Sequence, residues 1–330
     1  SGFVNAILRS VIREQDSIGI EDLAVNDIEA ISFIYNIPLW LINLWIREFG
    51  RDKTEDLCAW FNEQPKLTAR INTILIDIPQ CLTMLNEQGW AVTQDSNYED
   101  IIYINSHRGS LEKSEAFIKG YITFMDKASM LVARLVNPQP GERILDCCAA
   151  PGGKSMYMAA LMDNVGSLMS CDIHEHKIEL MNSNADRLGA SIVHTKVQDA
   201  TKLPDSWNSY FDRVLVDAPC SGLGILQKKL DMRWRKQESI LSELPPLQLA
   251  ILERAAMTVK EKGYLIYSTC TLNYKENEEV VESFLQKHKE FSIIPVADDF
   301  PLKSNSGMIT TYPPTDDMDG FFMVKMQRIS

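Results

Sequence analysis

The feature that most constrains the fold is a regular alternation of strand-like and helical runs from residue 143 onward. It follows two pairs of chain breakers, Asn137-Pro138 and Pro140-Gly141. Strands that alternate with helices form a parallel sheet covered by helices on both faces. We therefore expect a doubly wound α/β domain with five strands: Arg143–Cys147, Ser167–Asp172, Ile192–Val197, Phe211–Asp217 and Tyr264–Cys270.

Two differently patterned segments precede this domain. From Gly2 to Phe61 the apolar residues recur at helical spacing, and Pro38 and Gly50 suit the start and end of one helix. Because the first helix begins without an upstream partner, we expect Ser1 to open partway into a helical domain. From Leu67 to Gly120 the apolar runs are short and alternating, which predicts a small α+β segment.

The acidic composition limits the partners of the protein. The 330 residues include 33 Lys and Arg against 45 Asp and Glu, which gives a formal net charge of −12. Lys and Arg dominate phosphate binding, so this balance argues against a general nucleic-acid coat protein, although a local basic groove remains compatible with it. No apolar run approaches the ~20 residues of a membrane span, and we expect no membrane association.

The cysteines do not form a disulfide or zinc pattern. There are seven, an odd number, and no two are spaced as CxxC, so we expect reduced thiols and a cytoplasmic protein. His174 and His176 form an HxH pair, but no further ligand lies at zinc spacing. We therefore expect no metal.

A loop of small residues follows the first strand of the α/β domain. It runs from Asp146 to Ser155 (DCCAAPGGKS) and lets backbone N–H groups approach a ligand at the start of the next helix. The loop matches neither GxGxxG nor GxxxxGK[ST]. It therefore favours a compact cofactor with a carboxylate and a ribose over a pyrophosphate, and a tight turn without a ligand is the alternative.

Acidic residues close three consecutive strands beside this loop. Asp172 lies 172 − 152 = 20 residues beyond Gly152, where nucleotide-binding βαβ units place the residue that binds the ribose hydroxyls. Asp199 follows the third strand and Asp217 ends the fourth. Each could simply cap a helix, but three together beside a small-residue loop indicate a binding site.

Two thiols are predicted at the same edge of the sheet. Cys220 follows the fourth strand, in DAPCSGLG, and Cys270 ends the fifth, in YSTCT. A thiol is intrinsically nucleophilic, so modest activation would make either one a covalent catalyst. A buried cysteine is more often an inert small apolar residue, and we interpret Cys147 and Cys148 as strand-end packing in this way.

One short stretch is basic within the acidic chain. Residues 227–236 (QKKLDMRWRK) carry five cations against one Asp and include Trp234. Cations beside an exposed aromatic ring suit a splayed single strand of nucleic acid, and a solvated helix face is the alternative. The stretch predicts RNA contacts by Lys228, Lys229, Arg233, Arg235 and Lys236.

These motifs resemble the RsmB-type (Sun/Fmu) branch of the S-adenosylmethionine-dependent RNA cytosine-5 methyltransferases. The matching segments are LDCCAAPGGKS from Leu145, CDIHEHK from Cys171, QDA from Gln198, DAPCSGLG from Asp217, YSTCTLNYKENEEVV from Tyr267 and DGFF from Asp319. SGFVNAILR from Ser1 and PLWLINLWIREFG from Pro38 resemble the latter half of the NusB-like domain of this branch.

The resemblance implies three domains. Residues 1–64 would be part of a NusB-like RNA-binding domain, and residues 65–127 a small RNA-contacting α+β subdomain. Residues 128–330 would form the Rossmann-like catalytic domain of a class I methyltransferase.

The resemblance also implies S-adenosylmethionine as cofactor, released as S-adenosylhomocysteine. Asp172 would bind its ribose hydroxyls, Asp199 its adenine edge, and Asp217 would lie between its methionine end and the target base. The loop that holds it would comprise Cys148, Ala149, Ala150, Pro151, Gly152, Gly153 and Lys154.

The implied reaction is methyl transfer to carbon 5 of a specific cytidine in 16S ribosomal RNA. Cys270 corresponds to the nucleophile that attacks carbon 6, and Cys220 to the thiol that assists product release. Asp217, if neutral, would donate a hydrogen bond to ring nitrogen 3. The cytidine must be unpaired or flipped to reach these groups, and we expect the enzyme to act as a monomer.

Three alternatives remain open at this stage. A related methyltransferase would act on tRNA or another RNA. A nicotinamide-dependent dehydrogenase would share the sheet but should carry GxGxxG, and a non-catalytic RNA-binding module would use the NusB-like helices alone. Neither of the last two explains Cys220 and Cys270 together.

Overall fold

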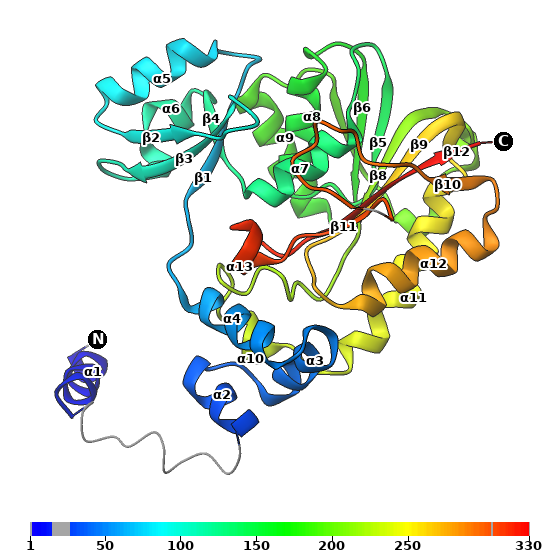
Figure 1. The fold of residues 1–330 in the computed structure, drawn as a ribbon. Helices are drawn as coiled ribbons and strands as arrows, with labels where there is room; N and C mark the ends of the chain where they lie inside the picture. Colours follow the sequence, from blue (N-terminus) through cyan, green and yellow to red (C-terminus); the bar gives the residue numbers. More distant parts are fainter. Residues whose placement is uncertain (1, 15–26, 305, 330) are drawn as a thin grey trace. The chain divides into compact units, whose positions relative to one another are not determined.

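The structure is a computed structural model that describes residues 2–14, 27–304 and 306–329 (Figure 1). Its residues divide into two compact units. The first comprises residues 1–63 and 229–238, and the second comprises residues 64–228 and 239–330. Ser1, on which the expectation of a partial helical domain rests, lies outside the described residues.

The first unit is helical. Pro38 caps the start of one helix and Gly50, with φ at 82°, ends it, as the sequence predicts. The rings of Trp45 and Phe61 lie 5.6 Å apart in its core. Its helices are α1 (Gly2–Glu14), α2 (Asp27–Tyr35), α3 (Leu39–Phe49), α4 (Arg51–Asn62) and the short α10 (Met232–Arg235), which is part of the basic stretch.

The second unit begins with a small α+β subdomain. Its four strands pair antiparallel in the order β2-β3-β1-β4. One face of the sheet is apolar, with Ile102 and Ile104 of β3 packed with Leu85 and Ala116 of its two α-helices. The elements are β1 (Thr68–Ile71), α5 (Ile78–Glu87), β2 (Ala91–Gln94), β3 (Ile101–Ser106), the 3₁₀ turn η2 (Leu111–Lys113), α6 (Glu115–Ile118) and β4 (Ile122–Phe124).

The rest of the second unit is a Rossmann-like α/β domain. Its sheet has the order β10-β12-β9-β8-β5-β6-β7, with β11 paired to β12. The five strands from β9 to β7 are parallel, and β10 to β12 add antiparallel pairs. The strands are β5 (Arg143–Asp146), β6 (Ser167–Asp172), β7 (Val193–Val197), β8 (Phe211–Asp217), β9 (Val259–Thr269), β10 (Phe291–Ile293), β11 (Met308–Thr310) and β12 (Phe322–Arg328).

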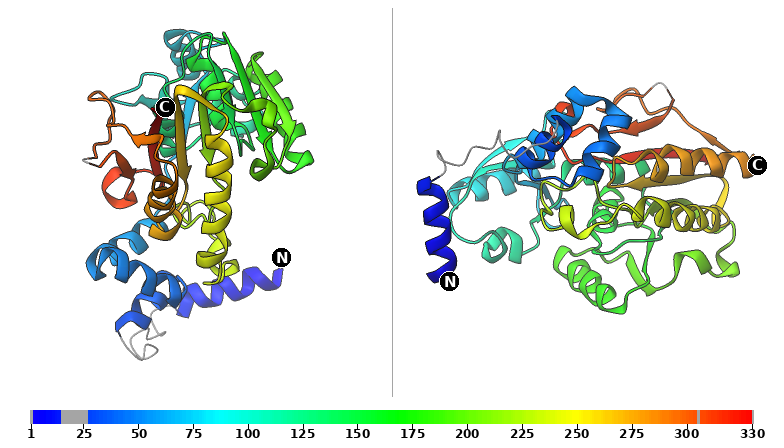
Figure 2. Two further views of the ribbon diagram at one scale, coloured as in Figure 1. Left: turned by 90° about the vertical axis from the view of Figure 1, so that its right-hand side faces the viewer. Right: turned by 90° about the horizontal axis from the view of Figure 1, so that it is seen from below.

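Helices cover both faces of this sheet (Figure 2). Successive strand residues point to opposite faces, so Ile144 packs with the α7 and α8 side while Leu145 packs with the α11 and α12 side. The elements are α7 (Lys127–Val136), α8 (Gly153–Leu161), α9 (Glu175–Leu188), η3 (Ala200–Lys202), η4 (Asp205–Trp207), α11 (Ile240–Ala256), η5 (Tyr274–Glu276), α12 (Glu278–Lys287) and α13 (Pro313–Asp316).

The strand order fixes where a ligand can bind. The chain runs from β5 outward to β6 and β7, then returns to the other side of β5 with β8 and β9. The crevice beyond the carboxyl ends of β5 and β8 is therefore the topological switch point, where doubly wound sheets bind their ligands.

Candidate active site

The carboxyl ends of four strands meet at the switch point. Asp146 ends β5 and is in register with Leu215 of β8 on one side and Ser170 of β6 on the other. Asp217 ends β8 and is in register with Ser268 of β9. Because these strands are parallel, the acidic residues at their ends and the loops that carry Cys220 and Cys270 lie at the same edge of the sheet.

The two strand-end thiols lie side by side. The sulfur atoms of Cys220 and Cys270 are 3.2 Å apart, and the backbone N–H of Cys270 donates a hydrogen bond to Cys220 Sγ at 3.3 Å. The hydrogen bond with Cys270, together with burial, raises the pKa of the Cys220 thiol well above its ordinary value. Cys220 is therefore a protonated thiol near neutral pH.

A lysine from the small-residue loop reaches the same edge. The Nζ of Lys154 donates to Asp217 Oδ2 at 2.7 Å, and the Ser268 hydroxyl donates to Asp217 Oδ1 at 2.8 Å. Burial alone would lower the pKa of Lys154, but the charge and hydrogen bond of Asp217 raise it above the ordinary lysine value. In this arrangement Asp217 accepts from both neighbours, and Lys154 is its ion-pair partner.

A fully buried carboxylate joins the two cysteine loops. Glu276 Oε2 accepts hydrogen bonds from the backbone N–H of Ser221 at 2.8 Å and from Gln248 at 2.9 Å. Its Oε1 accepts from the Ser221 hydroxyl at 2.5 Å and from the Asn273 amide at 2.9 Å. Glu276 has no exposed surface, and it is not among the site residues predicted from the sequence.

We expect Glu276→Gln to destabilise the fold and weaken the site, because the new amide N–H₂ would face donors where an acceptor stood. A buried donor left unsatisfied costs about 1–3 kcal/mol, which thermal unfolding would measure. The matched control is Glu279→Gln, whose side chain is exposed one turn further along the chain. Equal unfolding temperatures for the two variants would contradict this assignment.

The small-residue loop forms a tight cradle ahead of α8. Gly152 holds φ at 96°, a conformation that side chains rarely adopt, and a Cβ there would lie 3.2 Å from Met156 and 3.3 Å from Met181. Directly behind the loop, burial raises the pKa of Asp146 to about 7, although the Ser155 hydroxyl donates to it at 2.7 Å. The first-turn N–H groups of α8 have no acceptors within the helix and can bind an anionic group.

The cysteines and small residues of this loop contribute backbone groups to the site and determine the shape of the loop. Burial raises the pKa of both Cys147 and Cys148 well above the ordinary value, so both remain protonated. Ala149 donates its N–H to Cys171 O at 2.7 Å, and its side chain packs with Ala150, Ile178 and Met181. Pro151 and Gly153 complete the turn into α8.

The other two predicted acidic residues differ in their surroundings. Asp172 is 8% exposed, and its Oδ1 accepts the His174 N–H at 3.0 Å, which leaves Oδ2 as an acceptor. Asp199 caps η3, because one of its oxygens accepts both the hydroxyl and the N–H of Thr201, and these bonds lower its pKa. Helix capping was the alternative role for both residues. It describes the contacts of Asp199 better than those of Asp172.

The basic stretch does not act as one surface. Arg233 is 3% exposed, and its guanidinium donates to the Phe61 carbonyl at 2.6 Å and to the Asn62 side chain at 2.7 Å within the helical unit. Its predicted RNA contact is therefore wrong in this structure, because its donors stabilise the fold. Lys229, Arg235 and the neighbouring Trp234 are exposed, and Lys236 is half-buried.

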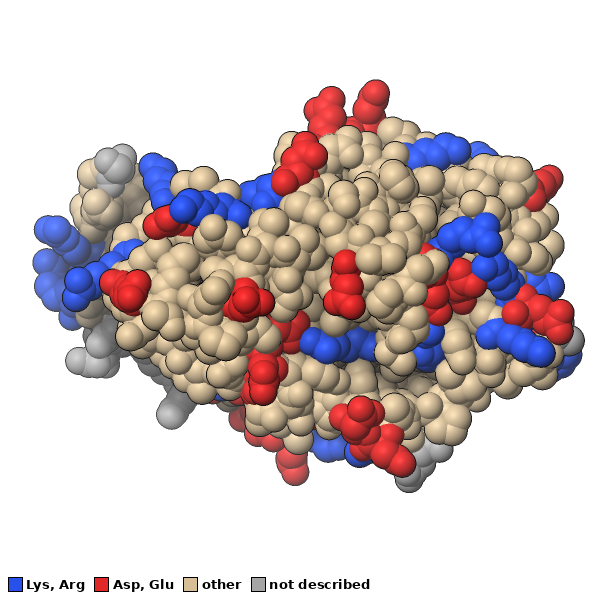
Figure 3. Space-filling model, turned by 90° about the horizontal axis from the view of Figure 1, so that it is seen from above, with Lys and Arg blue, Asp and Glu red and all other residues tan. Residues whose placement is uncertain are grey.

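Lys228 is exposed, but its ammonium is paired with carboxylates of the protein itself. Its Nζ forms ion pairs with Asp126 and with Asp319, the latter at 2.9 Å. Burial raises the pKa of Asp319 to about 7, and the nearby charge of Asp126 adds to this rise. Acidic and basic side chains are interspersed on the face drawn in Figure 3.

The described residues carry neither a cluster of metal ligands nor a single membrane-spanning helix. No group of three or more His, Cys, Asp or Glu side chains there could hold a metal ion. No single described helix is long and apolar enough to cross a membrane, although α2 and α3, bent by 114°, pass the length and composition test as a pair.

Comparisons with known families give two matches. Residues 133–327 match the family described as 16S rRNA methyltransferase RsmB/F. Residues 37–109 match the ferredoxin-like domain described as RsmF/B-like. The second match begins two residues before α3 of the helical unit and ends beyond β3.

Curated relatives are similar along nearly the whole chain. The chain is 36% identical to the "Probable ribosomal RNA small subunit methyltransferase B" of Bacillus subtilis, over 99% of this chain and 74% of that protein. It is 29% identical to the "Ribosomal RNA small subunit methyltransferase B" of Serratia proteamaculans, over 98% and 72% respectively.

Two solved structures share the fold. The structure titled PH0851 superposes with a TM-score of 0.86 at 32% identity and covers 91% of this chain and 68% of that one. The structure of NSun6 from Pyrococcus horikoshii with SFG has a TM-score of 0.79 at 21% identity, with 87% and 97% covered. The second is a likeness of fold alone.

Proposed function

Because the chain belongs to the RsmB/F family of 16S rRNA methyltransferases, we propose that it methylates carbon 5 of a cytidine in small-subunit ribosomal RNA through a covalent intermediate on Cys270. The observation that carries this proposal is the pair of thiols 3.2 Å apart at the switch point of the sheet. A single buried cysteine is commonly inert, whereas two adjacent thiols beside an ion pair supply the groups of a two-step covalent reaction.

Cys270 is the nucleophile in this proposal. Carbon 5 of cytosine is a poor nucleophile, so the ring must first be activated. Attack of the Cys270 thiolate on carbon 6 forms a C–S bond and moves the electron pair of the ring double bond onto carbon 5. Carbon 5 then accepts the methyl group.

The residues around Gly152 would hold S-adenosylmethionine, which supplies an electrophilic methyl group when bound. The cradle formed by residues 148–154, the free first-turn N–H groups of α8 and the Asp172 carboxylate fit its carboxylate and ribose. Asp199 lies beyond the next strand, where it would meet the adenine edge while it continues to cap η3.

The Lys154–Asp217 ion pair would stabilise the activated base. Negative charge develops on ring nitrogen 3 as the thiolate adds, and a preorganised donor at that point lowers the barrier. The ammonium of Lys154 can supply this donor, while Asp217 fixes its direction through the 2.7 Å bond. Lys154 thus acts on the base as well as in the cofactor loop.

Cys220 would assist release of the product. A solvent water accepts the carbon-5 proton. The electrons of the C–H bond restore the ring double bond as the C–S bond breaks, and the electron pair of the C–S bond returns to the sulfur of Cys270. A protonated thiol 3.2 Å away can donate a hydrogen bond to this leaving thiolate.

The RNA must present an unstacked cytidine. Both sulfurs lie in a part-buried site that a paired base in a helix cannot enter, so the target is unpaired or flipped. The exposed Lys229 and Arg235, with the half-buried Lys236, are our candidates for phosphate contacts. We propose that the protein acts as a monomer, with residues 1–64 and 65–127 as RNA-binding elements.

Bisulfite sequencing of 16S ribosomal RNA tests the proposal. We expect one protected cytidine in RNA from cells that contain the protein, and loss of that protection when its gene is deleted. The purified protein should restore the mark on RNA from the deletion strain with S-adenosylmethionine. Methylation of a different atom, or of tRNA in preference to 16S RNA, would overturn it.

We expect Asp172→Ala to weaken the binding of S-adenosylmethionine. Hydrogen bonds to a charged acceptor contribute about 1.5–3 kcal/mol, so the Kd should rise roughly ten- to hundredfold. Isothermal titration would measure this change. Asp186→Ala, an exposed position on α9 of the same βα unit, is the control; the same Kd for both variants would place the ribose elsewhere.

A further inference from the structure

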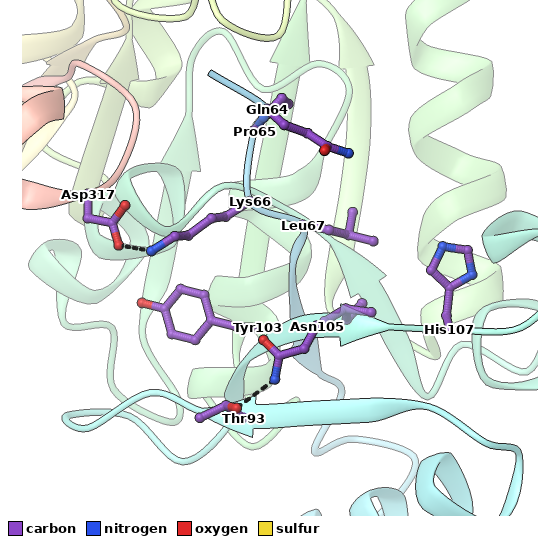
Figure 4. A pocket seen from close by; sticks show the side chains of 10 residues that line it. Gln64, Pro65, Lys66, Leu67, Thr93, Tyr103, Asn105, His107 and Asp317 are labelled. Atoms are coloured by element: carbon purple, nitrogen blue, oxygen red, sulfur yellow. Dashed lines mark hydrogen bonds and ion pairs between the residues drawn. The ribbon is translucent and has the colours of Figure 1, made fainter. Parts of the chain in front are cut away.

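A second pocket lies on the small α+β subdomain, apart from the thiols (Figure 4). It has a volume of about 690 Å³, within the range of sites for small ligands. Its walls come from β2, β3, the segment that enters β1 and the turn after α13. The lining side chains that bear on the argument are Lys66, Thr93, Tyr103, Asn105, His107 and Asp317.

The pocket uses the face of the small sheet that its two helices leave uncovered. Ile102 and Ile104 of β3 point into the apolar core, so the alternate residues Tyr103 and Asn105 point to the opposite face. The Tyr103 hydroxyl donates to Asp95 at 2.9 Å, which fixes the orientation of the half-buried ring. A fixed aromatic ring is a surface on which a nucleobase can stack.

Polar groups surround this ring. The Asn105 amide N–H donates to the Thr93 hydroxyl on the neighbouring strand at 2.8 Å, so its carbonyl oxygen is left as an acceptor for a ligand (Figure 4). His107, two residues after Asn105 in the chain, also lines the pocket. These side chains provide donors and acceptors suited to the edge of a heterocyclic base.

The charge of the pocket favours a base over a phosphate. Lys66 and Asp317, which both line the pocket, form an ion pair (Figure 4), so the two charges compensate each other. A phosphate site needs uncompensated cations or N–H groups, because phosphate carries negative charge. The pocket is therefore matched to an uncharged group with a hydrogen-bonding edge.

The pocket is linked to the catalytic loops by a short path of backbone. Asp317 is three residues before Gly320, a distance of at most ~11 Å along the chain. Gly320 donates its N–H to Gly224 O at 2.9 Å, and Gly224 donates its N–H to Cys270 O at 3.0 Å. A strand of RNA that delivers a cytidine to Cys270 therefore has this pocket within reach of nearby nucleotides.

We propose that this pocket binds the base of an unpaired nucleotide that neighbours the target cytidine, stacked on Tyr103 and hydrogen-bonded by Asn105. The inference rests on the proposed function, because it requires an RNA substrate. It adds a second point of recognition, so the enzyme would select its cytidine by the sequence of the flanking strand as well as by access to the thiols.

Steady-state methylation of 16S ribosomal RNA by purified variants tests the pocket. Tyr103→Ala should raise the KM for RNA at least about fivefold, the lower end of the loss of one base-stacking contact. Asn105→Ala, an exposed change that spares the fold, should raise it about two- to tenfold. In both variants kcat should change less than twofold and the Kd for S-adenosylmethionine should be unchanged.

The matched control is Asn86→Ala, an exposed asparagine on α5 outside the pocket. Photocrosslinking of 16S RNA that contains 4-thiouridine should join a nucleotide near the methylated cytidine to the peptide of residues 101–107. Wild-type KM values in both pocket variants would overturn the pocket. Failure of the proposed function would appear separately, as wild-type protein that does not methylate cytidine.

Discussion

Cys270→Ala is expected to abolish methyl transfer while the protein still binds S-adenosylmethionine. Without the sulfur, no bond forms to carbon 6 and carbon 5 stays unreactive. Removal of a catalytic nucleophile lowers turnover by roughly 10⁴- to 10⁶-fold in enzymes whose groups act as a unit. Incorporation of labelled methyl groups into 16S ribosomal RNA would measure the loss, and isothermal titration the retained cofactor binding.

Cys81→Ala is the matched control for this variant. Cys81 is a buried cysteine in the core of the small subdomain, and its replacement removes a thiol of the same kind away from the site. We expect it to methylate RNA at close to the wild-type rate. Undiminished turnover by Cys270→Ala would reject the covalent scheme.

The second large effect is expected from Cys220→Ala, which should trap a covalent complex between the protein and RNA. The methylated ring would remain bound to Cys270, because the thiol that stabilises the leaving sulfur is gone. A retarded band should persist on a denaturing gel and carry both labelled RNA and the labelled methyl group. Turnover should fall to about one event per enzyme molecule.

The double variant Cys220→Ala, Cys270→Ala separates a trapped intermediate from adventitious crosslinking. It should give no band, because the bond to carbon 6 comes from Cys270. If Cys220→Ala instead releases free methylated RNA at the wild-type rate, Cys220 has a lesser role than the one assigned to it.

The parallel part of the fold could be predicted from the sequence because its signals are local. Buried parallel strands appear as short apolar runs, and the helices between them fill the crossovers. Two of the five strands, Ser167–Asp172 and Phe211–Asp217, match the structure to the residue. The strand predicted from Tyr264 begins earlier, at Val259, because a register shift against β8 lets Val259 pair with Phe211.

The antiparallel strands at the edge of the sheet could not be predicted in the same way. β10 and β11 have only three residues each, too few for a periodic pattern. Their conformation depends on pairing with β12, which itself pairs with β9 more than fifty residues earlier in the chain. The recruitment of residues 229–238 into the helical unit is likewise a long-range effect.

The site shows the same division between local and long-range signals. The strand-end positions of Asp172, Asp217 and Cys270 follow from the strands themselves. The partners of these residues do not: the Lys154–Asp217 pair joins residues 63 apart, and Glu276 bonds to Ser221 55 residues away. The signal for Glu276 was available, because an acidic residue six positions after a strand-end cysteine needs buried partners if the loop folds inward.

The predicted RNA contact of Arg233 was wrong because it rested on local composition. A cluster of cations next to a tryptophan indicated a surface for phosphate, but a guanidinium has enough donors to hold several backbone carbonyls together. Arg233 donates in this way to the Phe61 carbonyl and to the Asn62 side chain at the end of α4. Charge counted along the sequence does not separate a residue that holds its own fold together from one that faces a ligand.

The proximity of the two sulfurs also bears on how the enzyme would behave under oxidative stress. Thiols at 3.2 Å need only a small approach before a peroxide could couple them, with loss of two protons and two electrons and reduction of the peroxide to water. This disulfide would inactivate both the nucleophile Cys270 and the thiol of Cys220 that assists release, and a reductant such as thioredoxin would restore both. The chemistry that suits the pair to the proposed turnover would thus also make that turnover sensitive to the redox state of its surroundings.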